Sequence, residues 1–275
     1  MRYQGKALEE RGKREARSVS PLRMPVRVLL VIAVLGVLAM LPWRPLRQHF
    51  LVVDHIQVKG LRYLDVARVR KRSGLREGQD LISLDLDRAR QSVLLEPRIR
   101  SARVSRSGLR GVEIHVEERV PALAVEHGEP WEIDAAGVLL EPLQPGVVAD
   151  VPVLAGPDFS TLRPGSQVQT PEVRRGLAWT AILSDNALRL AGQVSEIDVS
   201  ETRVTRLVLM TGVRVLAPAW PTGARQLSGL RATLADLAAK GMMPREVDMR
   251  CKDQIIVRGA RPLGPAATAA ASRES

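Results

Sequence analysis

An apolar run near the N-terminus, residues 28–41, constrains this chain more than any other feature. The run carries no charge and has no polar face, but it is shorter than the roughly 20 residues that cross a bilayer as a helix. Adding residues 22–27 before it and 42–43 after it gives sufficient length. In that case Arg27 reaches the headgroups and Trp43 lies in the opposite interface. We therefore predict a transmembrane helix over residues 28–43, followed by a linker at 44–49.

A soluble core helix and a cleaved signal peptide both fit the run less well than an anchor does. A core helix of a soluble domain would need a polar side, which this run lacks. A signal peptide would have a charged start and an apolar stretch of this length, but the sequence at 38–42 offers no small-x-small cleavage site. An uncleaved anchor therefore accounts for the run best.

The basic N-terminal tail, residues 1–27, predicts the orientation of the anchor. It contains eight Lys or Arg residues and three Glu residues. Such an excess of positive charge beside a span stays in the cytoplasm. The sequence thus predicts a single-pass type II protein whose large C-terminal part lies outside the cytoplasm.

The net charge of +11 raises the question of nucleic-acid binding. Five of these charges lie in the N-terminal tail, where topology and anionic lipid explain them. Two Phe and two Tyr leave few platforms for base stacking. We therefore expect no nucleic-acid partner.

The single cysteine, Cys251, cannot form an internal disulfide.

The first exported segment, residues 50–119, predicts a small α+β domain. Its elements follow in the order strand, helix, helix, strand, strand, and the last two strands form a hairpin around Ser107-Gly108. Two helices must then cover one face of a three-stranded sheet. The expected strands are 50–58, 99–106 and 111–116, and the expected helices are 65–74 and 85–95.

The second exported segment, residues 120–260, predicts a mixed domain with an antiparallel sheet. Thr170 and Pro171 mark a helix start as N-cap and first helical residue. A stripe of leucines predicts another helix over 223–240. The expected strands are 195–199, 204–210, 213–216, 245–250 and 254–258. The Ala-rich tail, residues 261–275, has no periodicity and is expected to be disordered.

The sequence shows no catalytic or metal-binding constellation. Glu113, His115 and Glu117 alternate on one strand, but the valines and isoleucine between them define the buried side, so these three residues belong to a solvated face. Asp134 and Asp198 are expected to cap turns. Cys251 has no histidine near it in sequence and is interpreted as a small apolar residue at a strand end. We predict no enzyme activity, no cofactor, no metal and no small-molecule substrate.

The order of several segments resembles a known family. The first unit contains "VDHIQVKG", then "LEPRIRSARVSR", then "GVEIHVEERVPALA". The second contains "WEIDAAGVLL", "VPVLAGPD" and "REVDMRCKDQIIVRG". Together they resemble a POTRA domain followed by the β-domain of the bacterial cell division protein family FtsQ, also called DivIB. The resemblance covers nearly the whole chain and depends on the order of the segments.

The resemblance implies a binding surface for another protein. In this family the last strand of the β-domain and the adjacent helix receive FtsB, which comes with FtsL. A strand at a sheet edge offers unpaired N–H and C=O groups to an incoming chain. Transferred by position, the partner-binding residues are Arg250, Cys251, Gln254, Ile255, Ile256, Val257 and Arg258. Cys251 departs from the family, which often has an aromatic residue there.

Alternation along the last strand divides its side chains into two sets that face opposite sides. Ile255 and Val257 should face one side, and Ile256 and Arg258 the other. One pair can pack on the core while the other is available for binding.

The resemblance, together with the expected anchor, implies a non-enzymatic scaffold of the division machinery. It would lie in the inner membrane at the division septum, with periplasmic domains that bind FtsB/FtsL-type proteins and other division proteins. The alternative is a POTRA-containing component of protein export or outer-membrane assembly, which would be expected to carry several POTRA repeats. An anchored cell-wall enzyme would need paired acids or a metal cluster.

Overall fold

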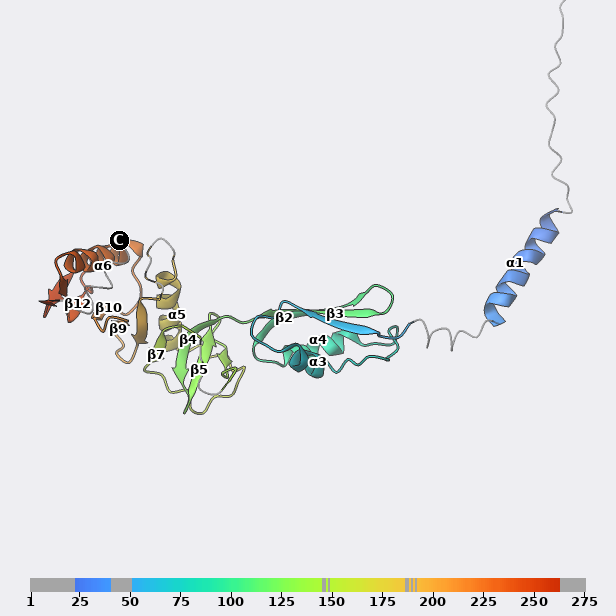
Figure 1. The fold of residues 1–275 in the computed structure, drawn as a ribbon, viewed down its shortest axis with the longest axis horizontal. Helices are drawn as coiled ribbons and strands as arrows, with labels where there is room; N and C mark the ends of the chain where they lie inside the picture. The colour runs from blue at the N-terminus through green and yellow to red at the C-terminus, as the bar shows by residue number, and fades with distance from the viewer. Residues whose placement is uncertain are drawn as a thin grey trace, which may run out of the picture. The chain divides into compact units, whose positions relative to one another are not determined.

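The computed structural model describes residues 23–40, 51–144, 147, 149–185, 188, 190 and 192–262. The chain divides into two compact units, residues 1–51 and 52–275. In the first unit, α1 spans Arg23–Met40, and the side chains described for it, those of residues 26–40, are exposed (Figure 1). The predicted span 28–43 coincides with α1 as far as Met40. Within the described ranges, no helix combines the length and the apolarity that crossing a bilayer requires.

Several predicted regions lie outside the described residues. These are most of the N-terminal tail, the end of the predicted span, the linker at 44–49 and all but the first two residues of the tail at 261–275.

The second unit begins with a three-stranded sheet and two helices, which we call the three-stranded module, residues 52–119. The predicted order of strand, helix, helix, strand, strand is confirmed, and the sheet order is β1-β3-β2. β1 runs parallel to β3, because the two helices return the chain before the β2–β3 hairpin forms. Its elements are β1 (His55–Lys59), α3 (Val66–Ser73), α4 (Leu86–Leu94), β2 (Ile99–Ser107) and β3 (Gly111–Glu118).

Local signals explain the ends of these helices. Gly74 ends α3 with φ of 70°, a left-handed conformation that glycine adopts without strain. The Asp85 carboxylate caps α4 by accepting a hydrogen bond from the Arg88 backbone N–H at 2.8 Å. The inward face of β3 is fully buried, as alternation predicted; its residues are Val112, Ile114 and Val116.

β1 starts later than the predicted strand at 50–58. The Val53 backbone N–H donates to the Gln79 carbonyl at 2.9 Å, and the Gly78 N–H donates to the Val53 carbonyl at 2.8 Å. The loop after α3 therefore takes the hydrogen bonds that a longer β1 would have used. Only from His55 does the chain pair with β3.

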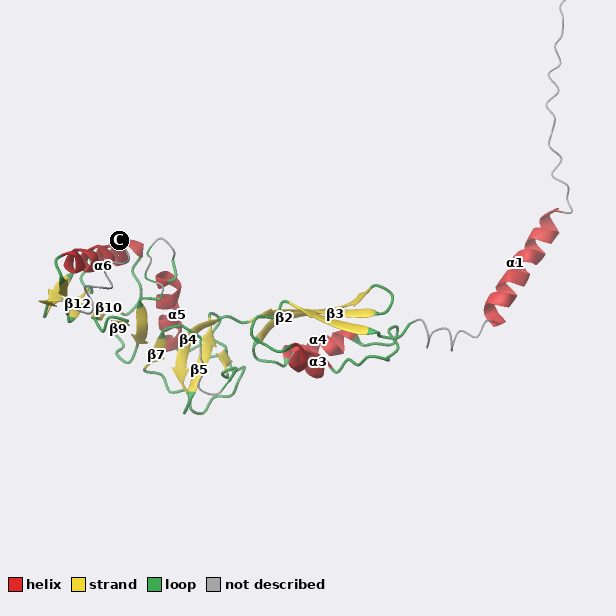
Figure 2. Cartoon of the chain, in the orientation of Figure 1, coloured by secondary structure: helices red, strands yellow, loops and turns green. Residues whose placement is uncertain are grey.

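The rest of the second unit is built on a nine-stranded sheet, and we call it the nine-stranded module, residues 120–262 (Figure 2). The order across the sheet is β13-β12-β10-β9-β8-β7-β4-β5-β6. A separate pair of short strands, β11 and β14, runs antiparallel. The bounds are β4 (Pro121–Glu126), β5 (Pro130–Asp134), β6 (Leu139–Leu140), β7 (Val153–Ala155), β8 (Val194–Asp198), β9 (Val204–Leu209), β10 (Arg214–Pro218), β11 (Met242–Met243), β12 (Glu246–Asp248), β13 (Ile256–Arg258) and β14 (Arg261–Pro262).

The predicted antiparallel sheet is observed in part, since five of the neighbouring strand pairs described in this sheet run antiparallel. Three neighbouring pairs run parallel, namely β4 with β7, β7 with β8, and β10 with β12. The last two pairs are each separated in sequence by a helix, α5 (Pro171–Leu183) and α6 (Ala224–Ala239). A helical connection allows the chain to re-enter the sheet in the same direction, which a tight hairpin cannot do.

Both helices pack their apolar sides onto the nine-stranded sheet. The predicted N-cap of α5 is confirmed, since the Thr170 hydroxyl accepts from the Val173 N–H at 3.4 Å. Trp179 of α5 is 1% exposed, and its indole N–H donates to the Ala219 carbonyl at 3.1 Å. Leu227 and Leu230 of α6 join the same core.

The two ends of this sheet differ. β6 lies at one end, and the loop at Gly165 and Ser166 hydrogen-bonds to its backbone. The Leu139 N–H donates to the Ser166 carbonyl at 2.9 Å, and the Gly165 N–H donates to the Leu139 carbonyl at 2.8 Å. β13 lies at the other end, and among the described strands it pairs only with β12.

Candidate partner-binding edge at β13

β13 occupies the sheet edge that sequence analysis assigned to a partner. It runs antiparallel to β12, with Val257 opposite Val247 and Ile256 opposite Asp248. The strand begins at Ile256, two residues later than predicted, because Lys252 and Asp253 form a turn and the next two residues complete the return. The predicted partner-binding residues therefore lie on one continuous turn and edge strand.

The side chains alternate as predicted. Ile255 packs against the buried core of the module, and Val257 is half-buried. Ile256 remains 40% exposed, and Arg258 is exposed beside Glu246, with 3.0 Å between Nη1 and Oε1. An exposed isoleucine on a strand at the edge of the described sheet can contact an added chain without disturbing the core.

Asp248, at the end of β12, organises the turn that leads to β13. The Arg250 guanidinium donates to both carboxylate oxygens of Asp248, at 2.9 and 2.6 Å, and the Arg250 backbone N–H donates at 3.1 Å. Hydrogen bonding from Arg250 lowers the pKa of Asp248, although burial of the carboxylate opposes this effect. In turn, hydrogen bonding to the Asp248 carboxylate raises the pKa of Arg250. Arg250 is thus held in place rather than left to move freely.

We expect the Asp248–Arg250 pair to make the fold sensitive to acid. Because the folded-state pKa of Asp248 lies below the unfolded value of about 3.9, its contribution is complete above that pH and is lost as the pH falls through the folded pKa. Urea unfolding at neutral pH should show Asp248→Asn to be less stable than wild type by about 1 kcal/mol, after discounting for the exposed arginine. The difference should shrink below about pH 4.

Asp236→Asn is the control for this measurement. Asp236 forms an exposed pair with Lys240 at 2.7 Å, and such pairs contribute little to stability. A difference between Asp248→Asn and wild type that does not change between neutral and acid pH would contradict the assigned role.

A groove of about 430 Å³ lies beside the edge strand, between the start of α6 and the turn. Its lining includes Gly223, Gly229, Cys251 and Ile255. Gln226 of α6 fixes the turn by donating its side-chain amide to the carbonyls of Met249 and Cys251. Helix, turn and strand therefore form one continuous surface.

Cys251 does not lie at a strand end, where sequence analysis placed it as a small apolar residue. It is exposed in the turn, because β12 already ends at Asp248. Two contributors to this surface were missed, Gln226 and Asp248. The Asp-x-Arg spacing of residues 248–250 could have identified the carboxylate, whereas nothing in the sequence connects Gln226 to the turn.

The remaining candidate residues have local roles. His115 is exposed, and Glu113 on the same face pairs with Lys59 at 2.6 Å, as expected for a solvated face. Asp198 accepts from the Ser200 backbone N–H at 2.9 Å, which confirms the predicted turn. Asp134 caps its own turn by accepting from the Val138 N–H at 2.8 Å, and it also pairs with an arginine. The described residues contain no cluster of three metal-ligating side chains.

Comparison with known proteins identifies relatives of the chain. Residues 51–119 match the family model of the FtsQ-type POTRA domain. A cell division protein FtsQ of Syntrophotalea carbinolica is 28% identical over 164 residues, which cover 59% of this chain and 58% of that protein. FtsQ of Anaeromyxobacter sp. strain K is 28% identical, with coverages of 71% and 67%. FtsQ of Streptomyces coelicolor is 27% identical, with coverages of 86% and 92%.

Proposed function

Since the chain belongs to the FtsQ/DivIB family of bacterial cell division proteins, we propose that it is a membrane-anchored, non-enzymatic scaffold that joins division proteins through its exported surface. The observation that carries this proposal is the edge position of β13, which pairs on one side only among the described strands and presents an exposed isoleucine beside a groove. The proposed partner is an FtsB/FtsL-type protein that adds a strand to this edge. The proposed contact residues are Arg250, Cys251, Gln254, Ile255, Ile256, Val257 and Arg258.

Strand addition fits the chemistry of the edge. Main-chain hydrogen bonds would supply much of the affinity, and pockets for alternate side chains would supply specificity. β13 has only three residues, so a partner strand gains few backbone bonds from it alone. The adjoining groove and the fixed Arg250 guanidinium would provide the remaining contacts.

A binding role agrees with the contacts of three polar groups in the nine-stranded module, Ser228, Asp134 and Asp198. Ser228 donates its hydroxyl to the Ala224 carbonyl of its own helix at 2.9 Å. Asp134 and Asp198 are engaged in turns and ion pairs. These contacts give each group a structural role and support a scaffold over an anchored cell-wall enzyme.

We place the anchor at the apolar segment that includes α1, completed by the residues after Met40 that sequence analysis assigned to the span. Large apolar side chains are exposed along α1, including Leu29, Leu35 and Met40. Lipid is the environment that such a surface favours. The N-terminal tail would lie in the cytoplasm, and residues after about 45 would lie in the periplasm at the division septum.

A topology reporter tests this placement. A reporter that is active only outside the cytoplasm should be active when fused after Arg119, because the basic tail determines the orientation. The same reporter at the N-terminus should be silent. The reverse pattern would exclude both the anchor and the exported scaffold.

Affinity purification tests the scaffold role. The tagged full chain, extracted from membranes in mild detergent, should bring down one or more single-pass division proteins, which mass spectrometry would identify. The control is the same chain with Arg70→Gln, which removes only an exposed ion pair with Glu77 in the three-stranded module and should leave the recovered set unchanged. Recovery of export or outer-membrane assembly components instead would favour the alternative function.

A further inference from the structure

The two sheet modules of the second unit meet through buried charges. Arg98, just before β2, and Arg119, just after β3, are neighbours, since the Arg119 N–H donates to the Arg98 carbonyl at 2.7 Å. Glu132 and Asp134 lie two residues apart on β5 and are also buried. Two adjacent arginines of the three-stranded module therefore face two carboxylates on one strand of the nine-stranded module.

Each arginine pairs with one of these carboxylates. Arg98 Nη2 lies 2.6 Å from Glu132 Oε2, and their side chains are only 2% and 4% exposed. Arg119 Nη1 lies 2.7 Å from Asp134 Oδ2. Positive and negative charges thus balance within the junction, as buried charges require.

The remaining polar atoms of the first pair are satisfied by the nine-stranded module. Arg98 donates from Nε and Nη2 to the Glu141 carbonyl, at 3.1 and 2.6 Å. The second oxygen of Glu132 accepts from the Ala149 N–H at 2.7 Å. A buried ion pair with this many additional hydrogen bonds fits one geometry only.

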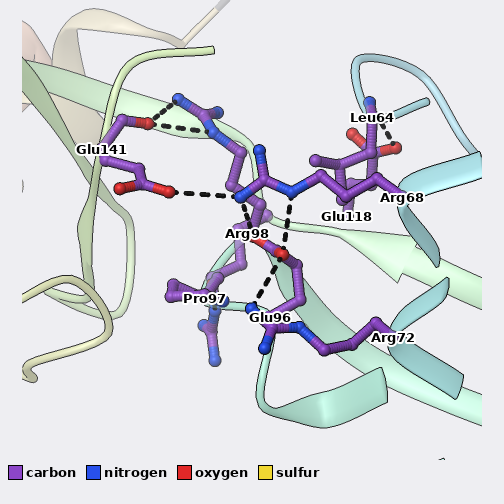
Figure 3. A network of polar contacts seen from close by, with 9 residues as sticks. Leu64, Arg68, Arg72, Glu96, Pro97, Arg98, Glu118 and Glu141 are labelled. Carbon is purple, nitrogen blue, oxygen red and sulfur yellow. Dashed lines mark hydrogen bonds and ion pairs between the residues drawn. The ribbon is translucent and has the colours of Figure 1, made fainter. Parts of the chain in front are cut away.

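A second, more exposed layer of charge surrounds the pair. Figure 3 shows Arg68 of α3 between two carboxylates, with Glu96 at 2.9 Å and Glu141 at 3.1 Å. Arg72 also approaches Glu96, at 3.6 Å. Leu143 of the nine-stranded module packs against the core of the three-stranded module. The contacts therefore connect α3, the start of β2 and the segment after β6.

We propose that this junction, Arg98 and Arg119 with Glu132 and Asp134, is a charge lock that fixes the angle between the two modules. Domains joined by a short connection move relative to each other unless their interface resists it. Here a rotation would separate buried opposite charges and leave each uncompensated, which is strongly unfavourable. The lock makes residues 52–262 a single rigid arm, so a protein bound at either module is held in a fixed orientation to the other.

The native cysteine provides a direct test on the full chain. With Ser105→Cys on the exposed face of β2, spin labels at positions 105 and 251 report the distance between the modules by pulsed electron resonance. Wild-type junction residues should give one narrow distance distribution in detergent. Arg98→Met, which leaves Glu132 buried without its partner, should broaden the distribution by about twofold or more.

Two further variants keep the test decisive. Glu132→Gln retains the shape of the side chain and removes its charge, so it should also broaden the distribution even if Arg98→Met folds poorly. Arg70→Gln, which breaks an exposed ion pair of 2.6 Å in the same module, should leave the distribution unchanged. A broad distribution in the chain with all junction residues intact, or a narrow one in folded Glu132→Gln, would overturn the lock.

Discussion

Proline at position 256 should abolish capture of the division partner by the full chain. Proline lacks the backbone N–H and fixes φ, so it removes a donor from a strand edge and blocks close approach of an added chain. Ile256 lies within β13, opposite Asp248, and its side chain is largely outside the core. In affinity purification from membranes, Ile256→Pro should lower partner recovery by at least tenfold, which corresponds to about 1.4 kcal/mol of binding free energy.

The alternating hydrogen-bond directions of a strand require two proline variants. Only one of two successive N–H groups points away from β12, so Ile255→Pro is tested separately. Ile256→Thr is the matched control, because it keeps the N–H and a β-branched shape and should retain most binding. If both proline variants unfold cooperatively like the wild type and still recover the partner at normal yield, the partner surface lies elsewhere, and the three-stranded module becomes the next candidate.

Trp179→Ala should be among the most destabilising single substitutions in the nine-stranded module. The side chain is 1% exposed, and its N–H is bonded to the Ala219 carbonyl, which follows β10. Removing it leaves a cavity and one hydrogen bond fewer to the Ala219 carbonyl, which still accepts from the Thr205 hydroxyl at 2.9 Å. The cavity alone is expected to lower the free energy of unfolding by about 3 to 5 kcal/mol. Chemical denaturation followed by far-ultraviolet circular dichroism measures this loss.

Trp220→Ala is the control on the same type of residue. Trp220 is 47% exposed, so its removal should change the unfolding free energy by well under half of the Trp179 effect. Equal effects of the two substitutions would show that the core of this module is not organised around α5 as described.

Local patterns predicted the elements whose partners are near in sequence. The β2–β3 hairpin follows from alternating apolar residues around Ser107-Gly108, and α5 follows from the cap at Thr170. Strands β4 to β7 were not predicted, because β6 and β7 have only two and three residues and β4 is buried in four of its six positions, so alternation gives little signal. The parallel pairing of β10 with β12 depends on how α6 packs, which no local pattern encodes.

The candidate site, like the fold, could be predicted from the sequence only in part. Alternation at 254–258 correctly predicted that Ile255 and Ile256 face opposite sides of the strand, and the structure shows that Ile255 is the packed residue and Ile256 the exposed one. Whether this strand binds a partner stays a prediction. The Arg98–Glu132 pair joins residues 34 positions apart, and each looks like an ordinary surface charge in the sequence. Both side chains become buried only when the chain folds and brings the two modules together.

The unequal ends of the nine-stranded sheet limit how molecules of this kind can assemble. A sheet open at both ends can add copies indefinitely, as fibrils do. In this chain the loop at Gly165 and Ser166 hydrogen-bonds to the backbone of β6, while β13 has only β12 as a neighbour among the described strands. Through the described strands of this sheet, each molecule can therefore accept one strand at β13 and none at β6, which predicts that strand addition to the nine-stranded sheet stops after a single partner strand. The proposed scaffold would thereby recruit its partner without polymerising through its nine-stranded sheet.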